Sequence, residues 1–140
     1  MNVLAIDHGS KRVGLAVGST DSGVAAPLKV VAHKGEKALI EDLKAVIKGE
    51  RIDQVVVGLP LMEDGSESAQ ADVVRAFVAN LEEAIEVPVV LEDERLSSRE
   101  IEAHMNAMGG QKAWKASGLD RDSAAATLFL QTYLDKTKTE

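Results

Sequence analysis

Acidic residues occur in three places where a strand or helix boundary is predicted. Asp7 ends an apolar run near the N-terminus, residues 92–94 follow a later apolar run, and Asp120 and Asp122 precede the last helical pattern. In an open α/β sheet, such positions can meet beyond the carboxyl ends of the strands. Carboxylates brought together there repel one another unless a cation intervenes. Mg²⁺ or Mn²⁺ is the natural cation for a site built only from oxygen ligands.

Two such ions, about 3.5–4 Å apart, can activate a water molecule and stabilise the leaving oxygen of a phosphodiester. Each acid also has a plain structural interpretation. Asp7 could pair with Arg12 across a turn, Arg95 could pair with an acid in 92–94, and Asp122 could be a helix-terminal charge. Convergence of all three groups at one end of a sheet favours a metal site over these separate roles.

The elements that would position these acids follow from the hydropathy pattern. Three apolar runs joined by short polar turns predict antiparallel strands, and Pro27 places the third at a sheet edge. Helical spacing and apolar strands then alternate, which is typical of parallel β-α-β units. The predicted strands are 3–7, 13–17, 24–32, 52–59 and 87–91, and the predicted helices are 39–47, 73–85, 97–108 and 123–134.

This order predicts one α/β domain over residues 1–140, with a five-stranded mixed sheet in the order 3-2-1-4-5 and helices on its faces. The arrangement is ribonuclease H-like. His8 is a candidate substrate contact because it adjoins Asp7, whereas His33 and His104 are expected at the surface. The three histidines show no zinc-site spacing.

The chain has a net charge of −7 and no cysteine. Cysteine-free composition excludes disulfides and thiolate chemistry and fits a reducing cytoplasm. No apolar run approaches the ~20 residues of a membrane span, and no signal peptide is recognisable. Because nucleic-acid-binding proteins usually carry a basic patch, any such patch here must be local. Lys11, Arg12 and Arg95 flank the acids and are the predicted phosphate contacts.

Four segments in a fixed order carry a family resemblance: Asp7-His-Gly-Ser-Lys-Arg-Val-Gly14, Val57-Gly-Leu-Pro-Leu61 with Asp64-Gly65, Asp93-Glu-Arg-Leu-Ser-Ser98, and Asp122-Ser-Ala-Ala-Ala126. With them the chain resembles the YqgF/RuvX family of pre-16S rRNA nucleases, formerly described as Holliday junction resolvases. The resemblance implies cytoplasmic rRNA maturation and Asp7, Glu94 and Asp122 as catalytic metal ligands. Met62 departs from the family pattern, where Asn is expected.

The function predicted from the residues and this resemblance is metal-dependent hydrolysis of phosphodiester bonds at the 5′ end of pre-16S rRNA. Three alternatives stay open. A Holliday junction resolvase would act on branched DNA, and a symmetric cut would favour a homodimer. An actin-like ATP-binding phosphotransferase would need a second lobe, for which 140 residues leave no room. A non-catalytic RNA-binding assembly factor would fit the acidic charge.

Overall fold

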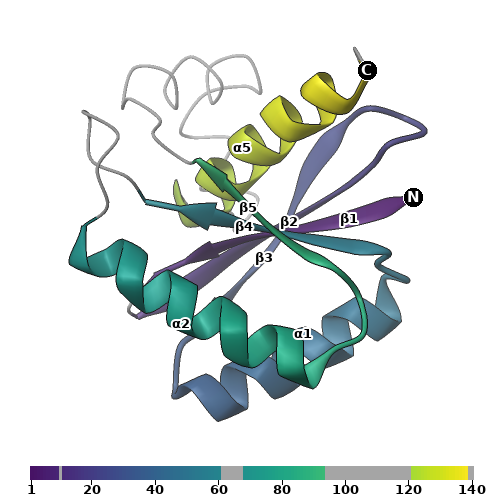
Figure 1. Cartoon of the computed structure of the whole chain (residues 1–140). Coiled ribbons are helices and arrows are strands. Elements are labelled where there is room, and N and C mark those ends of the chain that lie inside the picture. Colours follow the sequence, from purple (N-terminus) through teal and green to yellow (C-terminus); the bar gives the residue numbers. More distant parts are fainter. Residues whose placement is uncertain (10, 61–67, 94–120, 139–140) are drawn as a thin grey trace.

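The computed structural model describes residues 1–9, 11–60, 68–93 and 121–138. These residues form a five-stranded mixed sheet between two helical layers (Figure 1). The elements are β1 (Asn2–His8), β2 (Arg12–Ser19), β3 (Ala25–Ala32), α1 (Glu36–Gly49), β4 (Gln54–Leu59), α2 (Ala69–Ala84), β5 (Val89–Asp93) and α5 (Arg121–Lys138). The strand order is β3-β2-β1-β4-β5, which confirms the predicted order and the ribonuclease H-like class.

The central strand β1 pairs on both sides, antiparallel with β2 and parallel with β4. The hairpin between β1 and β2 is closed by the Gly9 N–H, which donates to the Arg12 carbonyl at 3.0 Å. On the far side of β2, the edge strand β3 carries Pro27, as predicted. The pairing of β2 with β3 shifts between Leu15 and Ala16, next to this proline, because proline has no N–H to donate to a ladder.

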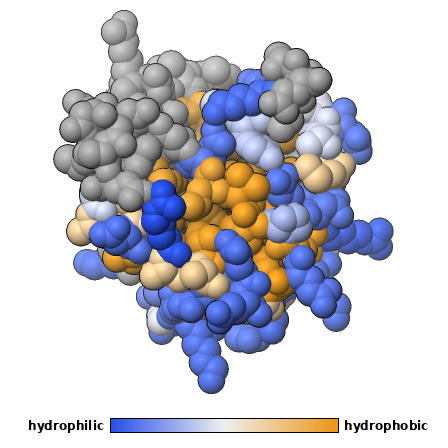
Figure 2. Space-filling model, viewed as in Figure 1, coloured by the Kyte–Doolittle hydropathy of each residue, from blue (hydrophilic) through white to orange (hydrophobic). Residues whose placement is uncertain are grey.

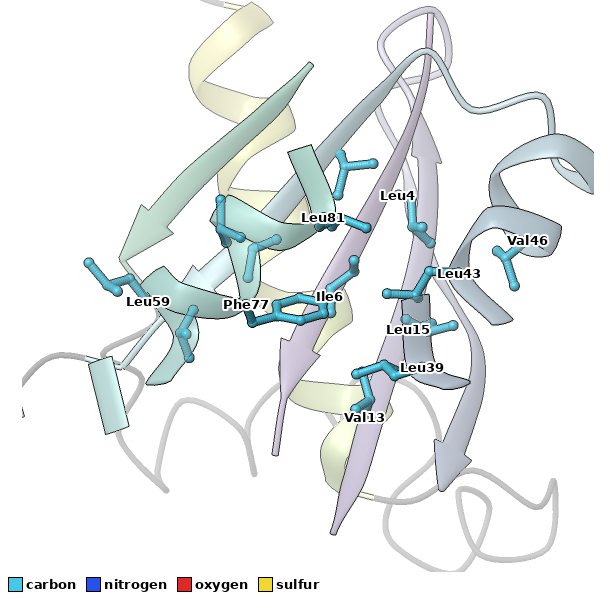
Figure 3. Packing of buried hydrophobic residues seen from close by; sticks show 14 of the residues in the cluster. Leu4, Ile6, Val13, Leu15, Leu39, Leu43, Val46, Leu59, Phe77 and Leu81 are labelled. Atoms are coloured by element: carbon cyan, nitrogen blue, oxygen red, sulfur yellow. The ribbon is translucent and has the colours of Figure 1, made fainter. Parts of the chain in front are cut away.

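The layer of α1 and α2 covers one face of the sheet. Figure 3 shows Leu39 and Leu43 of α1 and Phe77 of α2 pointing toward the side chains of β1 and β2. These side chains are fully buried, and the removal of their apolar surface from water is the main contribution that stabilises the packing of the two helices on the sheet. Figure 2, in the same view as Figure 1, shows apolar surface at the centre of the molecule, with hydrophilic residues below it and to its right.

The helix α5 covers the opposite face. Its buried residues Phe129 and Leu130 pack on Val3 and Ala5 of β1 in a second core cluster. Near the end of α5, Leu134 packs against the backbone of β2 at Gly18, where an added Cβ would lie 2.8 Å from Leu134 Cδ1.

The direction of α5 follows from this contact, because Gly18 pairs with Val3 at the amino end of β1. Figure 1 accordingly shows the C-terminal end of α5 toward the amino end of β1. The stretch from Asp122 to Leu134 spans about 18 Å of helix, whereas Val3 to Asp7 spans about 13 Å of strand. The helix α5 therefore begins near the carboxyl edge of β1.

Several predicted boundaries were wrong. The strand β1 continues through His8, whose backbone pairs with Val13. The strand β5 covers Val89–Asp93 rather than 87–91, because its ladder begins at the Pro88 carbonyl, which accepts from the Val55 N–H at 2.9 Å. The strand therefore does not end at Leu91.

The helix α2 begins at Ala69, four residues before the predicted start at 73. Val73 is 50% exposed, and Ala71 takes the buried position one turn before Val74. The N-cap of this helix is Ser68, whose side chain accepts from the Ala71 N–H. The predicted helix 97–108 and the position of Met62 lie outside the described residues.

Candidate active site

Asp7 lies at the penultimate position of β1, at the carboxyl edge of the central strand, and is half-buried. Side chains alternate faces along a strand, so Asp7 shares a face with Val3 and Ala5, which pack under α5. The site is therefore on the α5 side of the sheet. This is a stricter placement than the sequence allowed, because the apolar run alone did not distinguish the two faces.

Glycines flank Asp7 on the same face of the sheet. Gly14 of β2 pairs directly with Asp7. On the other side, Ile6 pairs with Val57 of β4, so Gly58 occupies the row of Asp7. Neither glycine contributes a side chain beside the carboxylate. Asp7 thus has backbone rather than side chains as its lateral neighbours, which suits the close approach of a cation or phosphate.

Glu92 occupies the same row, one strand further along. It pairs with Gly58, which puts its Cα two strand spacings, about 10 Å, from that of Asp7. Its carboxylate is mostly buried and forms an ion pair with the Lys136 ammonium of α5. Glu92 therefore lies on the same face as Asp7, and its charge is already balanced by a cation from the chain itself.

The structure describes four of the six predicted site residues, Asp122 by its backbone alone. Asp7, Lys11 and Arg12 lie together at the β1–β2 turn, and both basic side chains are exposed. The backbone of Asp122 lies in the first turn of α5. Glu94 and Arg95 lie outside the described residues. Among the residues that the structure describes, no group of three or more His, Asp or Glu side chains is close enough to hold a metal ion.

His8 is not a substrate contact, contrary to the expectation from its neighbour Asp7. Its side chain points to the opposite face of the sheet, where only 6% of the residue is exposed. Its ring lies 4.4 Å from that of Phe77 and 5.2 Å from that of His33, between centroids. Neither ring nitrogen has a hydrogen-bond partner among the described residues. Because side chains alternate along a strand, the residue after Asp7 must face the layer of α1 and α2, where His8 lies against the apolar side chain of Phe77.

Burial lowers the pKa of His8 below its ordinary value, and the nearby charge of His33 lowers it further. A hydrogen bond with its own backbone and the negative charge of Glu36 raise the pKa of His8, but by less than these two effects lower it. The unfolded chain therefore binds a proton more readily than the native state does. The contribution of neutral His8 to stability is complete above about pH 6.5 and is lost as the pH falls toward the lowered native pKa.

We expect the urea concentration at the unfolding midpoint of the unaltered protein to decrease when the pH is lowered from 7.5 to 5.5. The substitution His8→Leu should reduce this decrease. The leucine retains contact with Phe77 and removes the proton-binding group. The matched variant His33→Gln should keep most of the fall, because His33 is only half-buried. An equal fall in His8→Leu and the unaltered protein would mean that other groups govern the acid sensitivity.

Solved structures that match this chain share its fold. The fowlpox virus resolvase in complex with Holliday junction DNA matches with a TM-score of 0.61 at 12% identity, covering 98% of this chain and 99% of that one. RuvC of T. thermophilus, also solved with a Holliday junction substrate, matches with a TM-score of 0.61 at 17% identity and covers 92% of each chain. At these identities the likeness establishes the ribonuclease H-like fold alone.

The sequence comparisons are more specific. The family model RuvX, described as Holliday junction resolvase, matches residues 1–136, and the chain belongs to this family. A relative from Maridesulfovibrio salexigens named "Putative pre-16S rRNA nuclease" is 39% identical over 96% of this chain and 98% of its own length. A relative of the same name from Chloroflexus aurantiacus is 37% identical over 95% of this chain and 86% of its own length. The predicted family is thus confirmed.

Within the described ranges, no helix is both long and apolar enough to cross a bilayer.

Proposed function

We propose that this protein is a metal-dependent endonuclease that processes the 5′ end of precursor 16S ribosomal RNA. The observation that carries this proposal is the setting of Asp7. A half-buried carboxylate stands at the carboxyl edge of the central strand, between two glycines and beside the exposed cations Lys11 and Arg12. An acid that only stabilised the fold could use the adjacent positive charge but would not require bare backbone on both sides of it.

Asp7, Glu94 and Asp122 would hold the metal. Their oxygens are hard ligands, the type that Mg²⁺ and Mn²⁺ prefer. Asp7 belongs to β1 and Asp122 to α5. Bound there, a divalent ion supplies a water of lowered pKa and stabilises charge on the phosphoryl oxygens. The chain's own contribution is to fix the three carboxylates on rigid elements and to bind the phosphates on either side of the scissile bond.

The relatives' name supports RNA as the substrate, and such a substrate implies a cytoplasmic location. The family description supports a second candidate, cleavage of a DNA four-way junction. A symmetric junction cut needs two active sites, so that activity would require a homodimer.

The two candidates are separated by offering one preparation both substrates. We expect cleavage of an RNA that spans the mature 5′ end of 16S rRNA, dependent on added Mg²⁺ or Mn²⁺ and abolished by a chelator. Metal binding measured by calorimetry without substrate gives a readout independent of turnover. Paired cuts in a four-way DNA junction with no RNA cleavage would favour the resolvase. Tight RNA binding without cleavage at any metal concentration would favour a non-catalytic assembly factor.

We expect Lys11, Arg12 and Arg95 to contribute mainly to substrate binding. Replacing one of them with Ala should weaken RNA binding and make the slope of log affinity against log salt concentration shallower by about one unit, because one phosphate contact is lost. Lys44→Ala is the matched control, since Lys44 pairs with Glu41 on α1. Unchanged slopes in all three variants would show that the substrate's phosphates bind elsewhere.

A further inference from the structure

Positive charge is concentrated near the N-terminus. The first 37 residues carry five Lys or Arg and three Asp or Glu, whereas the remaining residues carry eleven and twenty. A polyanion is repelled by most of this chain and attracted only where the sign of the charge is locally reversed. Four of the five cations fall in two short segments, at Lys11 and Arg12 and at Lys34 and Lys37.

These two segments are held side by side. The His33 N–H donates to the Lys11 carbonyl at 2.8 Å, and Arg12 pairs with Ala32 at the end of β3. The connection from β3 to α1 is thus hydrogen-bonded to the β1–β2 turn. Figure 1 shows α1 beginning on the side of the sheet where β1 ends. Because β1 and β3 are separated by β2, this connection lies about two strand spacings, or 10 Å, from the strand of Asp7.

The lysines of this surface are available to a ligand. Lys11, Lys34 and Lys37 are exposed, and among the described residues none of them has an ion-pair partner. The acid beside them, Glu36, is turned toward α2, where its carboxylate accepts from Asn80 Nδ2 at 2.6 Å. Glu36 is therefore engaged by an amide of another helix, and Glu41, one turn after Lys37, pairs with Lys44.

Lys37 also occupies a position that its own helix disfavours. It lies in the first turn of α1, where the backbone dipole favours negative charge. The N-cap Gly35 has a φ of 121° and supplies no side-chain acceptor for the first N–H groups. The acid of this turn, Glu36, is directed toward Asn80 of α2. A phosphate of a bound ligand would interact favourably with both the ammonium and these N–H groups.

We propose that Lys34 and Lys37 form, with Lys11, a second phosphate-binding surface for the RNA backbone. This proposal rests on the nuclease function proposed above. The strand that passes Asp7 continues over the β1–β2 turn to the start of α1, so the enzyme contacts RNA beyond the scissile phosphate. Lys34 and Lys37 bind substrate and take no part in bond cleavage, because the connection from β3 to α1 is separated from the strand of Asp7 by β2.

The test compares two double variants, each of which removes two positive charges in or next to α1. Lys34→Gln/Lys37→Gln alters the proposed surface, whereas Lys44→Gln/Lys48→Gln alters the far end of α1. We expect the first to make the salt slope of RNA binding shallower by about one to two units. Its KM should rise while kcat at saturating RNA stays unchanged, and its melting temperature should not fall. The control should match the unaltered protein in all of these.

A truncated RNA sharpens the test. An RNA cut back to a few nucleotides around the scissile bond cannot reach the start of α1, so the unaltered protein and Lys34→Gln/Lys37→Gln should bind it equally. If both double variants bind the long RNA with the same slope while cleavage persists, this proposal is overturned and the nuclease function stands. If the unaltered protein neither binds nor cleaves RNA, both proposals fail together.

Discussion

Asp7→Asn should reduce metal-dependent RNA cleavage by more than about 100-fold while leaving the fold intact. Losing a residue that merely supports a metal ligand costs 10–100-fold, so losing a ligand itself should cost at least as much. The substitution removes one negative charge from a site where we expect carboxylates to repel one another. The melting temperature without metal should therefore stay the same or rise.

The measurement is single-turnover cleavage across a Mg²⁺ or Mn²⁺ titration, with calorimetric metal binding alongside it. Asp21→Asn is the matched control, because Asp21 is exposed and its carboxylate lies near the N-terminal ammonium at the opposite end of the sheet. Unchanged cleavage by Asp7→Asn would refute the assignment of this residue. A large loss of melting temperature without metal would instead show that Asp7 serves a structural ion pair.

The sheet could be predicted from the sequence because its order is fixed by local signals. Short polar turns force neighbouring strands to be antiparallel, and a strand separated by a helix must cross over to a parallel position. Pro27 then restricts its strand to an edge, where the structure has it. Each of these signals lies within the element that it determines, so no long-range information is needed.

The faces of the sheet could not be predicted in the same way. The run Val55–Val57 is apolar on both sides, because β4 is buried under helices on both faces. Such a strand shows no alternation from which a face could be read. His8 illustrates the consequence. Its proximity to Asp7 in the sequence suggested a shared site, but the strand directs the two side chains to opposite layers. The basic surface of Lys34 and Lys37 depends on tertiary contact with the β1–β2 turn, which no local pattern contains.

The second acid of the site is best identified through the length of β5. The sequence suggested that the strand ends at Leu91, which would make alternation a poor guide to the residues beyond it. The strand in fact continues through Asp93, with Val89 and Leu91 packed on the α1–α2 side and Glu92 on the α5 side. The length of β5 thus places Glu92, whereas Glu94 and the side chain of Asp93 lie outside the described residues.

Glu92 is on the correct face, but Lys136 already neutralises its carboxylate. A metal ion would have to displace this ammonium, whereas Glu94 is the acid that the family resemblance selects. We therefore expect Glu94→Gln to abolish metal-dependent cleavage and Asp93→Asn to reduce it only partly. Glu92→Gln should also leave substantial activity, since its main loss is the ion pair with α5.

Single-turnover cleavage of the three variants across the same metal titration separates these assignments. Lys136→Gln is the matched control for Glu92→Gln, because each variant breaks the same ion pair from one side. Equal effects of these two would confine Glu92 to a structural role. Loss of cleavage in Asp93→Asn with retained activity in Glu94→Gln would shift the ligand by one residue. If Glu92→Gln alone is inactive while Lys136→Gln cleaves RNA, the metal must bind Glu92, and Lys136 would then occupy the cation position when the metal is absent.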